Sequence, residues 1–494
     1  MSVAVALIAV LATPVVHALA VTLAARPPGL RDVVNALFAI VLAGLTVYLV
    51  QAAALHETAR IVLARPLPNV ELAFALEPLG ALIAATVATL GVLAAAHTSG
   101  VVRATQEKAP ARMMAFIALA SAAMMGVCFS ANLFTFFVAY QALTLATFPL
   151  VAHRGDDDAR KAARTYLATL LMASAGFFLP AMVWTYAIAG ALDFHQGGVL
   201  AGKVDPITAS VLLVLFVLGL AMTAIPPVHR WLPVSIAAPF PALVTIQGLA
   251  VLPAGGVGLL KIASYVFGST VLQSATWATR GLIVLAGVSM CVAALIALSK
   301  QDIRERLAYS CMAQSLAVVM GALLAAPVSS AVGLFAASLQ VVALACASAT
   351  LTMAAGTVFA ATGRRNVVDY SGLGRVMPWT FAGFALAAAS MIGMPPFSGA
   401  WSKLWLIVAA AAAAMPWAAA LLGAAAILTF VHLGPLAASA LAGRAPTDAF
   451  KRPDGASILL AAPVILSAGA TLWLLVLAEP LVNFLQPFWT GGGR

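Results

Sequence analysis

Long apolar runs, separated by short polar segments, follow one another along the whole chain. A helix needs about 20 apolar residues to cross the hydrocarbon core of a bilayer. About fourteen stretches reach this length, and the stretch 403–440 is long enough for a broken helix plus a span. The stretches run near 3–24, 33–55, 73–97, 112–129, 131–152, 165–190, 206–225, 239–267, 276–299, 305–325, 328–360, 378–398, 403–440 and 457–478.

The residues within these runs favour helices over strands. Strands of a membrane β-barrel alternate polar and apolar side chains, whereas these runs are uniformly apolar and rich in Ala and Leu. The first run has no charged segment before it and no convincing cleavage site, so we expect a retained helix rather than a signal peptide. The pattern predicts an all-α polytopic membrane protein of about 14 transmembrane helices.

Composition supports the same class of protein. Hydrophobic residues occupy 63% of the 494 positions and charged residues only 9%, whereas a soluble domain carries roughly 25% charged residues. So few charges cannot cover a water-facing surface of this size, which excludes a soluble enzyme, a nucleic-acid binder and a disordered protein. The net charge of +10 is the excess expected from loops that obey the positive-inside rule.

The positions of the basic residues test the number of spans. With fourteen spans, the odd-numbered loops hold 19 of the 26 Lys and Arg residues, and the even-numbered loops and tails hold 5. Lys261 and Lys403 complete the set and lie inside apolar stretches. Because cytoplasmic loops carry the excess of Lys and Arg, this division predicts that both termini lie on the outer side of the membrane.

Nothing in the sequence indicates a soluble domain or a cofactor site. The longest polar stretch, 443–455, has the length of an ordinary loop, and the four cysteines are isolated within apolar runs without a CxxC pair. Metal and iron–sulfur ligation are therefore not expected, and no GxGxxG or P-loop motif indicates a nucleotide site. We expect no cofactor, no metal and no catalytic centre in this chain.

Two Pro-Pro interruptions, Pro226-Pro227 and Pro395-Pro396, share a pattern. Each is followed by a short spacer and a tryptophan (Trp231 and Trp401), and the pairs lie 169 residues apart. Proline removes a backbone donor and clashes with the preceding turn, so we expect a broken helix at each site. Matching breaks in two halves are typical of transporters built from repeated units. The alternative is an ordinary loop end, which Arg230 supports at the first site.

Several segments resemble one known family. Residues 227–243 resemble the PLHxWLP…APTPVSAL motif of the proton-translocating antiporter-like subunits of respiratory complex I, membrane-bound hydrogenases and Mrp-type sodium/proton antiporters. Residues 132–149 resemble NLFxFFVFWELLSLxxY, 304–314 resemble KRLLAYSSxxQ, 371–378 resemble GGLGRxMP, and 393–403 resemble GxPPFSGFWSK. These motifs occur in the family's order over about residues 75–405. Tyr140 and the continuation 148–155 favour the Mrp-type antiporter branch, and within it the D component.

The resemblance implies an organisation of the whole chain. It implies fourteen helices with two inverted five-helix repeats, each with a broken helix, and termini on the outer side. The expected units are helices 1–3 in 1–110, a first repeat (helices 4–8) in 111–270, a second repeat (helices 9–13) in 271–442, and helix 14 with the tail in 443–494.

The resemblance also assigns the residues of the proton path, and most of them are replaced here. The family's Glu on the fifth helix, Lys on the seventh, His on the eighth, and His and Lys on the eleventh correspond to Gln141, Met222, Gln247, Leu344 and Ser348. Glutamine keeps the shape and hydrogen bonding of Glu but does not titrate, and Met cannot titrate. Only the lysine of the twelfth helix is retained, as Lys403.

Lys403 is therefore the strongest candidate for the ion path, since an intramembrane lysine is functional by default. The alternative is snorkelling or a hydrogen bond to the broken helix. Glu77, near the outer end of the third helix, is a second candidate, against an ordinary acid at a wet helix end. We expect Lys261 near a membrane face, where its stem can snorkel, and His229 at the inner rim beside Arg230.

We expect His17 and His432 to be buried imidazoles with satisfied hydrogen bonds. The sequence as a whole predicts a membrane subunit of a multisubunit complex in the cell inner (plasma) membrane, with H+ and, as a second candidate, Na+ as the ion. Its partners are the bilayer and other membrane subunits, not nucleic acid. Three alternatives stay open: a non-conducting scaffold, a partner in a redox-driven complex of NADH:quinone or hydrogenase-like type, and a partner in inorganic-carbon uptake.

Overall fold

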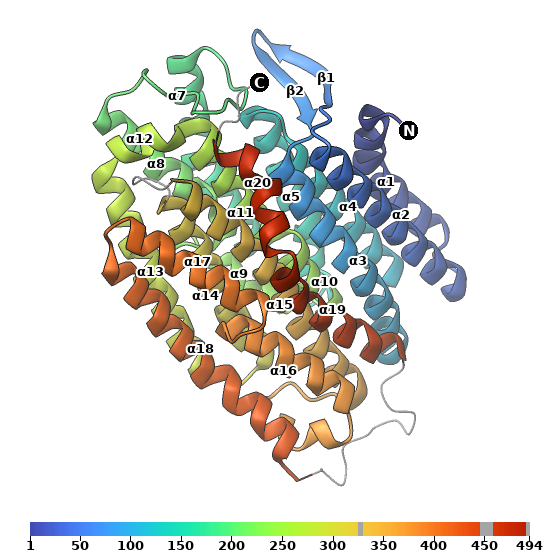
Figure 1. Ribbon diagram of the computed structural model, residues 1–494. Helices are drawn as coiled ribbons and strands as arrows, with labels where there is room; N and C mark the ends of the chain where they lie inside the picture. The colour runs from blue at the N-terminus through green and yellow to red at the C-terminus, as the bar shows by residue number, and fades with distance from the viewer. Residues whose placement is uncertain (325–329, 445–457, 491–494) are drawn as a thin grey trace.

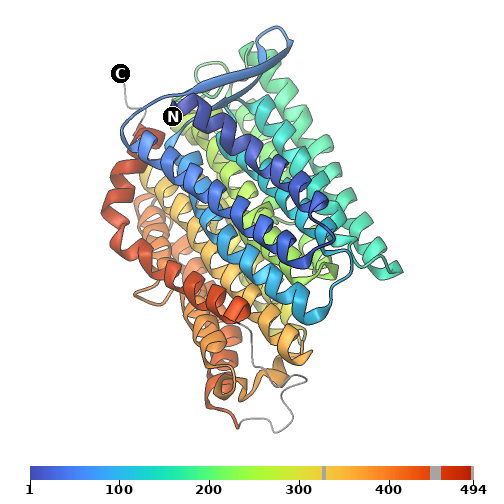
Figure 2. The same cartoon turned by 90° about the vertical axis from the view of Figure 1, so that its right-hand side faces the viewer.

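The computed structural model describes residues 1–324, 330–444 and 458–490, which fold into an elongated bundle of helices (Figures 1 and 2). Within the described residues, eleven helices are long and apolar enough to cross a membrane, and a twelfth span results if the bent pair Val367–Arg375 and Pro378–Ile392 is counted as one. The predicted class, a helical polytopic membrane protein, is confirmed. The number fourteen stays a prediction.

Five helices open the chain, and proline or a polar cap marks their starts. Proline stands in the first turn of the second, third and fourth helices, where its missing N–H costs no hydrogen bond. The Asn132 side chain accepts a hydrogen bond from the Thr135 N–H at the start of the fifth. These helices are α1 (Val3–Leu23), α2 (Pro28–Ala54), α3 (Pro78–Thr105), α4 (Pro110–Phe129) and α5 (Leu133–Val151).

A β-hairpin between α2 and α3 corrects the all-α prediction. Strands β1 (Arg60–Leu67) and β2 (Val70–Ala75) pair antiparallel and lie at one end of the bundle, beside the start of α1 (Figure 1). The turn places Asn69 at a φ of 57°, a conformation that Asn adopts more readily than most residues. The expected third span, 73–97, therefore begins later, at Pro78. The segment before Pro78 is too short and too polar to cross a membrane, and it forms the hairpin instead.

The middle of the chain forms helices with breaks and π-helical turns. The first expected break is present, because α8 ends at Gly219, before Pro226. The next long apolar run is continuous but irregular, with π-helical segments at Thr245–Leu249 and Ile262–Phe267. The elements are α6 (Asp157–Ala173), η1 (Ser174–Phe178), α7 (Leu179–Ala189), α8 (Pro206–Gly219), η2 (Ala221–Thr223), α9 (Trp231–Val234), η3 (Ser235–Ala237), α10 (Phe240–Val244), η4 (Thr245–Leu249), α11 (Val251–Lys261), η5 (Ile262–Phe267) and α12 (Gly268–Ser274).

The second expected break lies between α16 and α17, around Pro395-Pro396. The stretch 403–440 divides as expected into the end of a broken helix and a further long helix. The remaining elements are α13 (Thr276–Ser299), α14 (Ile303–Leu323), α15 (Ser330–Thr362), η6 (Val367–Tyr370), η7 (Leu373–Arg375), α16 (Pro378–Ile392), α17 (Ser398–Ala412), α18 (Pro416–Ala442), α19 (Ile458–Val476) and α20 (Ala478–Thr490).

Burial separates a central group of helices from a peripheral one. The most apolar windows of Phe240–Ser274, Ile303–Leu323 and Ala331–Thr362 are 100%, 94% and 89% buried, against 22% for Pro28–Ala54 and 33% for Pro416–Ala442. The peripheral helices expose large apolar side chains, as a lipid-facing surface does. The buried interior of the bundle is therefore formed mainly by α10–α12, α14 and α15.

Candidate ion path through the bundle interior

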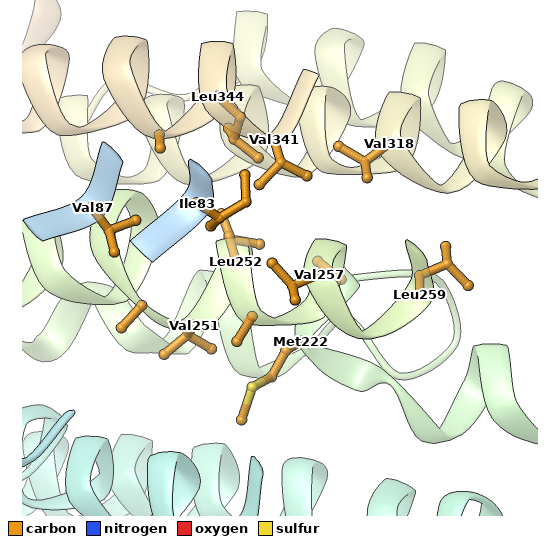
Figure 3. Packing of buried hydrophobic residues seen from close by; sticks show 14 of the residues in the cluster. Ile83, Val87, Met222, Val251, Leu252, Val257, Leu259, Val318, Val341 and Leu344 are labelled. Carbon is orange, nitrogen blue, oxygen red and sulfur yellow. The ribbon is translucent and has the colours of Figure 1, made fainter. Parts of the chain in front are cut away.

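Two of the positions assigned to the ion path carry apolar side chains that pack among other buried apolar residues. Figure 3 shows Met222 and Leu344 among buried aliphatic side chains of α3, α11, α14 and α15. Met222 is fully buried and Leu344 is 2% exposed. A charged side chain at either position would have to be desolvated without a counter-charge. Met and Leu fill this space instead, so these two positions contribute packing.

The position of the fifth-helix acid keeps a hydrogen bond but no charge. The Ser174 hydroxyl donates to Gln141 Oε1 at 3.2 Å, and Gln141 Nε2 has no partner within the described residues. The neighbouring Tyr140 joins α5 to the first break, because its hydroxyl oxygen accepts a hydrogen bond from the Met222 backbone N–H at 2.9 Å. The structure therefore joins Tyr140, rather than Gln141 itself, to position 222 in η2.

Gln247 and Ser348 do come together, at the interface of η4 with α15. Ser348 Oγ donates to the Gln247 backbone carbonyl at 3.2 Å, and Thr352 Oγ1 donates to Gln247 Oε1 at 3.4 Å. The Cys311 thiol also approaches Gln247 Oε1, at 3.9 Å. Gln247 Nε2 is buried without a partner among the described side chains. The cluster is polar but contains no group that carries charge at neutral pH.

A second polar cluster continues from α14 to α17, and it joins Gln314 and Ser402, which lie in the motifs, through Gln340, which does not. Gln340 Nε2 donates to Gln314 Oε1 at 3.1 Å, and Ser402 Oγ donates to Gln340 Oε1 at 2.6 Å. A cavity of about 10 Å³ beside them is at the lower limit for one water molecule. Gln340 could have been found as the lone glutamine within the apolar stretch 328–360.

Lys403 follows Ser402 on α17 and lies at the second break. Its side chain is 8% exposed, and its ammonium donates to the backbone carbonyl of Met391, near the end of α16. This is the hydrogen bond to the broken helix that was expected as the alternative role of this lysine. In the part of the chain that the structure describes, no carboxylate forms an ion pair with Lys403. An apolar cavity of about 410 Å³, lined by Pro395, Phe397 and Trp401, lies beside it.

Glu77 and Lys261 form a buried ion pair, and this overturns the expectation that Lys261 snorkels to a membrane face. Lys261 is fully buried, and its Nζ lies 2.6 Å from Glu77 Oε1. It also donates to the carbonyls of Cys128 and Ser130 at 2.8 and 2.9 Å and to Ser130 Oγ at 3.1 Å, at the carboxyl end of α4. The Tyr265 hydroxyl donates to Glu77 Oε2 at 2.6 Å. The lysine is held inside because three hydrogen-bond acceptors and the Glu77 carboxylate replace its water.

The histidines fall into different environments. His432 is a satisfied buried imidazole, as expected, with its two ring nitrogens 2.9 Å from the Leu428 carbonyl and 3.2 Å from Ser310 Oγ. His229 is half-buried in the first break, and its Nδ1 has no described partner. The hydrogen bonds found here do not join His229 to the other candidates. His17 contradicts the expectation in part, because its Nε2 is buried without a partner in the described structure.

No metal-binding group is found in the described ranges, where no three His, Cys, Asp or Glu side chains gather in a suitable cluster. The four cysteines are free, and Cys128, Cys311 and Cys346 are buried. The interior therefore offers a discontinuous row of neutral polar side chains, with one ion pair at one end and one lysine at the second break.

Comparison with known proteins places these positions in a family. The family model "NADH:quinone oxidoreductase/Mrp antiporter, TM" matches residues 130–429. NADH-quinone oxidoreductase subunit N of Desulforudis audaxviator is 29% identical over 339 residues, which cover 67% of this chain and 65% of that protein. An Na(+)/H(+) antiporter subunit of Alkalihalophilus pseudofirmus is 25% identical over 287 residues, 58% of this chain and 56% of that protein. The chain thus spans less than two thirds of each relative's length.

Solved structures share the fold over nearly the full chain. A chain of the Mrp complex from Dietzia sp. has a TM-score of 0.83 at 22% identity and covers 99% of this chain and 98% of its own. A chain of respiratory complex I from Thermus thermophilus has a TM-score of 0.81 at 21% identity, with 99% and 100% covered. The likeness to these structures concerns the fold alone.

Proposed function

The chain belongs to the NADH:quinone oxidoreductase/Mrp antiporter family, and from this we propose that it is a membrane subunit of a multisubunit complex that translocates ions. H+ is the first candidate ion and Na+ the second. The environment of Lys403 is the observation that supports this proposal most directly. An amine buried at a helix break, without a carboxylate partner in the described residues, can bind and release a proton inside the membrane.

The proposed path combines titratable residues with neutral polar residues. Glu77 with Lys261 forms one end, and Lys403 forms the last titratable station. We assign Gln141, Gln247 and Ser348 to the path as neutral polar stations, and His229 is kept as a candidate at the first break. Neutral amides and hydroxyls hold water but do not carry charge, so proton movement between the charged stations requires water molecules.

We also propose the topology that the motifs imply: fourteen helices, inverted repeats in 111–270 and 271–442, and a cell inner membrane location with both termini outside. Two features support it. The chain has a helix break at each of the two Pro-Pro pairs, Pro226-Pro227 and Pro395-Pro396. The start of α1 and the end of α20 lie at the same end of the bundle (Figures 1 and 2).

The test is proton flux through the purified native complex in liposomes that contain a pH-sensitive dye. Lys403→Ala is expected to lower the flux at least tenfold, while Lys203→Ala, at an exposed lysine, leaves it unchanged. Lys403→Arg keeps the positive charge but cannot release a proton, because Arg stays protonated. This variant is therefore also expected to lower the proton flux. Full flux in Lys403→Ala would refute a conducting role for this subunit.

A second candidate function is a scaffold that conducts nothing itself. The apolar packing of Met222 and Leu344 (Figure 3) supports it. In that case Lys403→Ala retains the flux of the complex, whereas removal of the whole chain dissociates the partners. The proteins that co-purify decide between further alternatives: peripheral redox subunits indicate a redox-driven complex, and a zinc-binding cytoplasmic partner indicates inorganic-carbon uptake.

A further inference from the structure

A cavity outside the proposed path lies between the four N-terminal helices and η4. Its volume is about 50 Å³, enough for roughly three water molecules at 10–15 Å³ each. Most of its wall is aliphatic, but His17, Asn35, Thr98, Ser121 and Thr245 place polar groups on it, one or more from each surrounding element. A cavity with several polar groups on different sides has the partners that buried water needs.

His17 has a buried nitrogen without a partner at this cavity. The residue is 8% exposed, and its ring stacks on Phe38 with 5.3 Å between centroids and 1° between planes. Stacking holds the ring in one orientation, yet Nε2 has no hydrogen bond within the described residues. An unsatisfied buried polar group costs about 1–3 kcal/mol. Water in the cavity removes that cost.

Charged groups lie beyond the cavity, toward the end of the bundle where α2 begins. Asp32 is 7% exposed there and pairs with Arg31 at 3.0 Å and with Arg103 at 2.7 Å. Asn35 follows one helical turn deeper on the same helix, where residues three apart share a face, and its Nδ2 donates to the Ala95 carbonyl at 3.2 Å. His17 lies about 9 Å inside the end of α1 at 1.5 Å per residue.

On the inner side, the cavity ends at the π-helical segment η4. Thr245 lines it, and Gln247, two residues further on, faces the cluster with Ser348 and Thr352. The cavity and that cluster therefore contact the same short segment. His17 is the one titratable residue among the described residues that line the cavity.

We propose that this cavity is a hydrated proton-binding site and that His17 Nε2 is its proton acceptor. A hydronium ion in the cavity donates its proton to the Nε2 lone pair, which leaves water and an imidazolium, and the reverse step returns the proton to water. The site gives protons from the Asp32 end of the bundle a station beside η4, where Gln247 stands in place of the family's His. This inference rests on the proposed function.

Hydration is tested first, with the small hydrophilic reagent aminoethyl methanethiosulfonate on membrane vesicles that contain the full complex. Ser121→Cys places a thiol at the cavity, and Val41→Cys places one on the exposed apolar face of α2, where Val41 is 42% exposed. Because the thiolate attacks the reagent's sulfur and displaces the sulfinate, and thiolate formation requires water, Ser121→Cys is expected to react at least tenfold faster. Equal rates would overturn the proposal and indicate a cavity filled by an apolar chain.

Proton binding is tested by proton flux through the purified complex in the liposomes described above for Lys403. His17→Gln keeps a polar side chain without a titrating group and is expected to lower flux at least fivefold, whereas His56→Gln, at an exposed loop histidine, does not. Gly91→Leu fills the cavity from α3, where an added Cβ meets nothing within 4 Å, and is expected to lower both flux and thiol reactivity.

The outcomes separate this proposal from the proposed function. Unchanged flux in His17→Gln together with a reactive Ser121→Cys would overturn the proton-binding role. A wild-type complex without flux would refute the proposed function and the proton step with it, while the thiol reactivity would still decide whether the cavity holds water.

Discussion

Replacing Lys261 by methionine should destabilise the protein strongly, because the change leaves Glu77 as a buried, unpaired carboxylate. The Lys261 side chain is fully buried and Glu77 is 15% exposed, with 2.6 Å between Nζ and Oε1. Removing one partner of a buried ion pair costs about 3–5 kcal/mol. The partial exposure of Glu77 and its hydrogen bond from Tyr265 favour the lower end of this range.

The lost hydrogen bonds act in the same direction. Lys261 donates to the Cys128 and Ser130 carbonyls, and acceptors left unpaired in a buried site cost about 1 kcal/mol each or more. These terms overlap with the charge term, so the total is kept at about 3–5 kcal/mol. At an unfolding entropy of about 2.1 cal/mol/K per residue, the expected decrease in Tm is roughly 3–5 °C.

The assay is thermal unfolding of the detergent-purified protein, followed by loss of the monodisperse peak in size-exclusion chromatography. A double-mutant cycle with Glu77→Gln isolates the pair. Glu77→Gln with Lys261→Met removes both charges, so the double variant should be more stable than the sum of the single effects by about 2 kcal/mol.

Lys300→Met is the matched control. Lys300 pairs with Glu305 at 2.9 Å, but both side chains are 34% exposed, and such surface pairs contribute about 0–1 kcal/mol. A Tm for Lys261→Met within 1 °C of wild type, or equal to that of Lys300→Met, would refute the reasoning. It would mean that Glu77 becomes protonated or hydrated without cost.

Three further outcomes are expected. Gln340→Leu should destabilise by about 1–3 kcal/mol, because Gln314 Oε1 loses its donor in a buried site and the Ser402 hydroxyl keeps only the Gly399 carbonyl as its acceptor; thermal unfolding measures this. Gly255→Ala should lower the folded yield, because a Cβ there would lie 2.5 Å from the Met222 carbonyl carbon and overpacking costs about 1–3 kcal/mol. Stability should fall as the pH drops below about 6.5, because burial lowers the pKa of His153, in the loop after α5, so that the unfolded chain binds the proton more tightly; unfolding between pH 5 and 8 measures the slope.

Each of these has a control. Gln51→Leu, at an exposed glutamine, should change Tm little, and an equal decrease in both variants would contradict the role of the buried hydrogen bond. Gly281→Ala adds a Cβ that meets nothing within 4 Å and should fold normally. His153→Gln should flatten the slope between pH 5 and 7, and an unchanged slope would show that another group causes it.

Local patterns predict the breaks in the fold but not the hairpin or the ion pair. Proline acts on the turn that contains it, so Pro226 and Pro395 mark helix ends without knowledge of any partner. The segment 60–75 forms a hairpin that a search for membrane spans does not detect, because its strands are short and the end of β2 merges with the apolar run 73–97. The sequence predicts a membrane face for Lys261 because its partner Glu77 is distant along the chain.

The candidate site also has some features that the sequence predicts and others that only the tertiary structure reveals. The motifs identify the positions at which ionisable residues are replaced, including Gln141 and Gln247. They do not identify Gln340, whose partners Gln314 and Ser402 lie on two other helices. They also do not reveal the cavity at His17, because a cavity depends on how four helices and η4 pack together.

The sequence by itself determined the membrane class, the approximate spans, the helix breaks and the shortage of ionisable groups. These are properties of residue type averaged over about 20 positions or confined to one turn. The tertiary structure decided which polar groups meet, among them Glu77 with Lys261 and Gln340 with Ser402. Such contacts depend on the rotation and register of each helix against its neighbours, and the uniformly apolar stretches of this chain carry little pattern that specifies either.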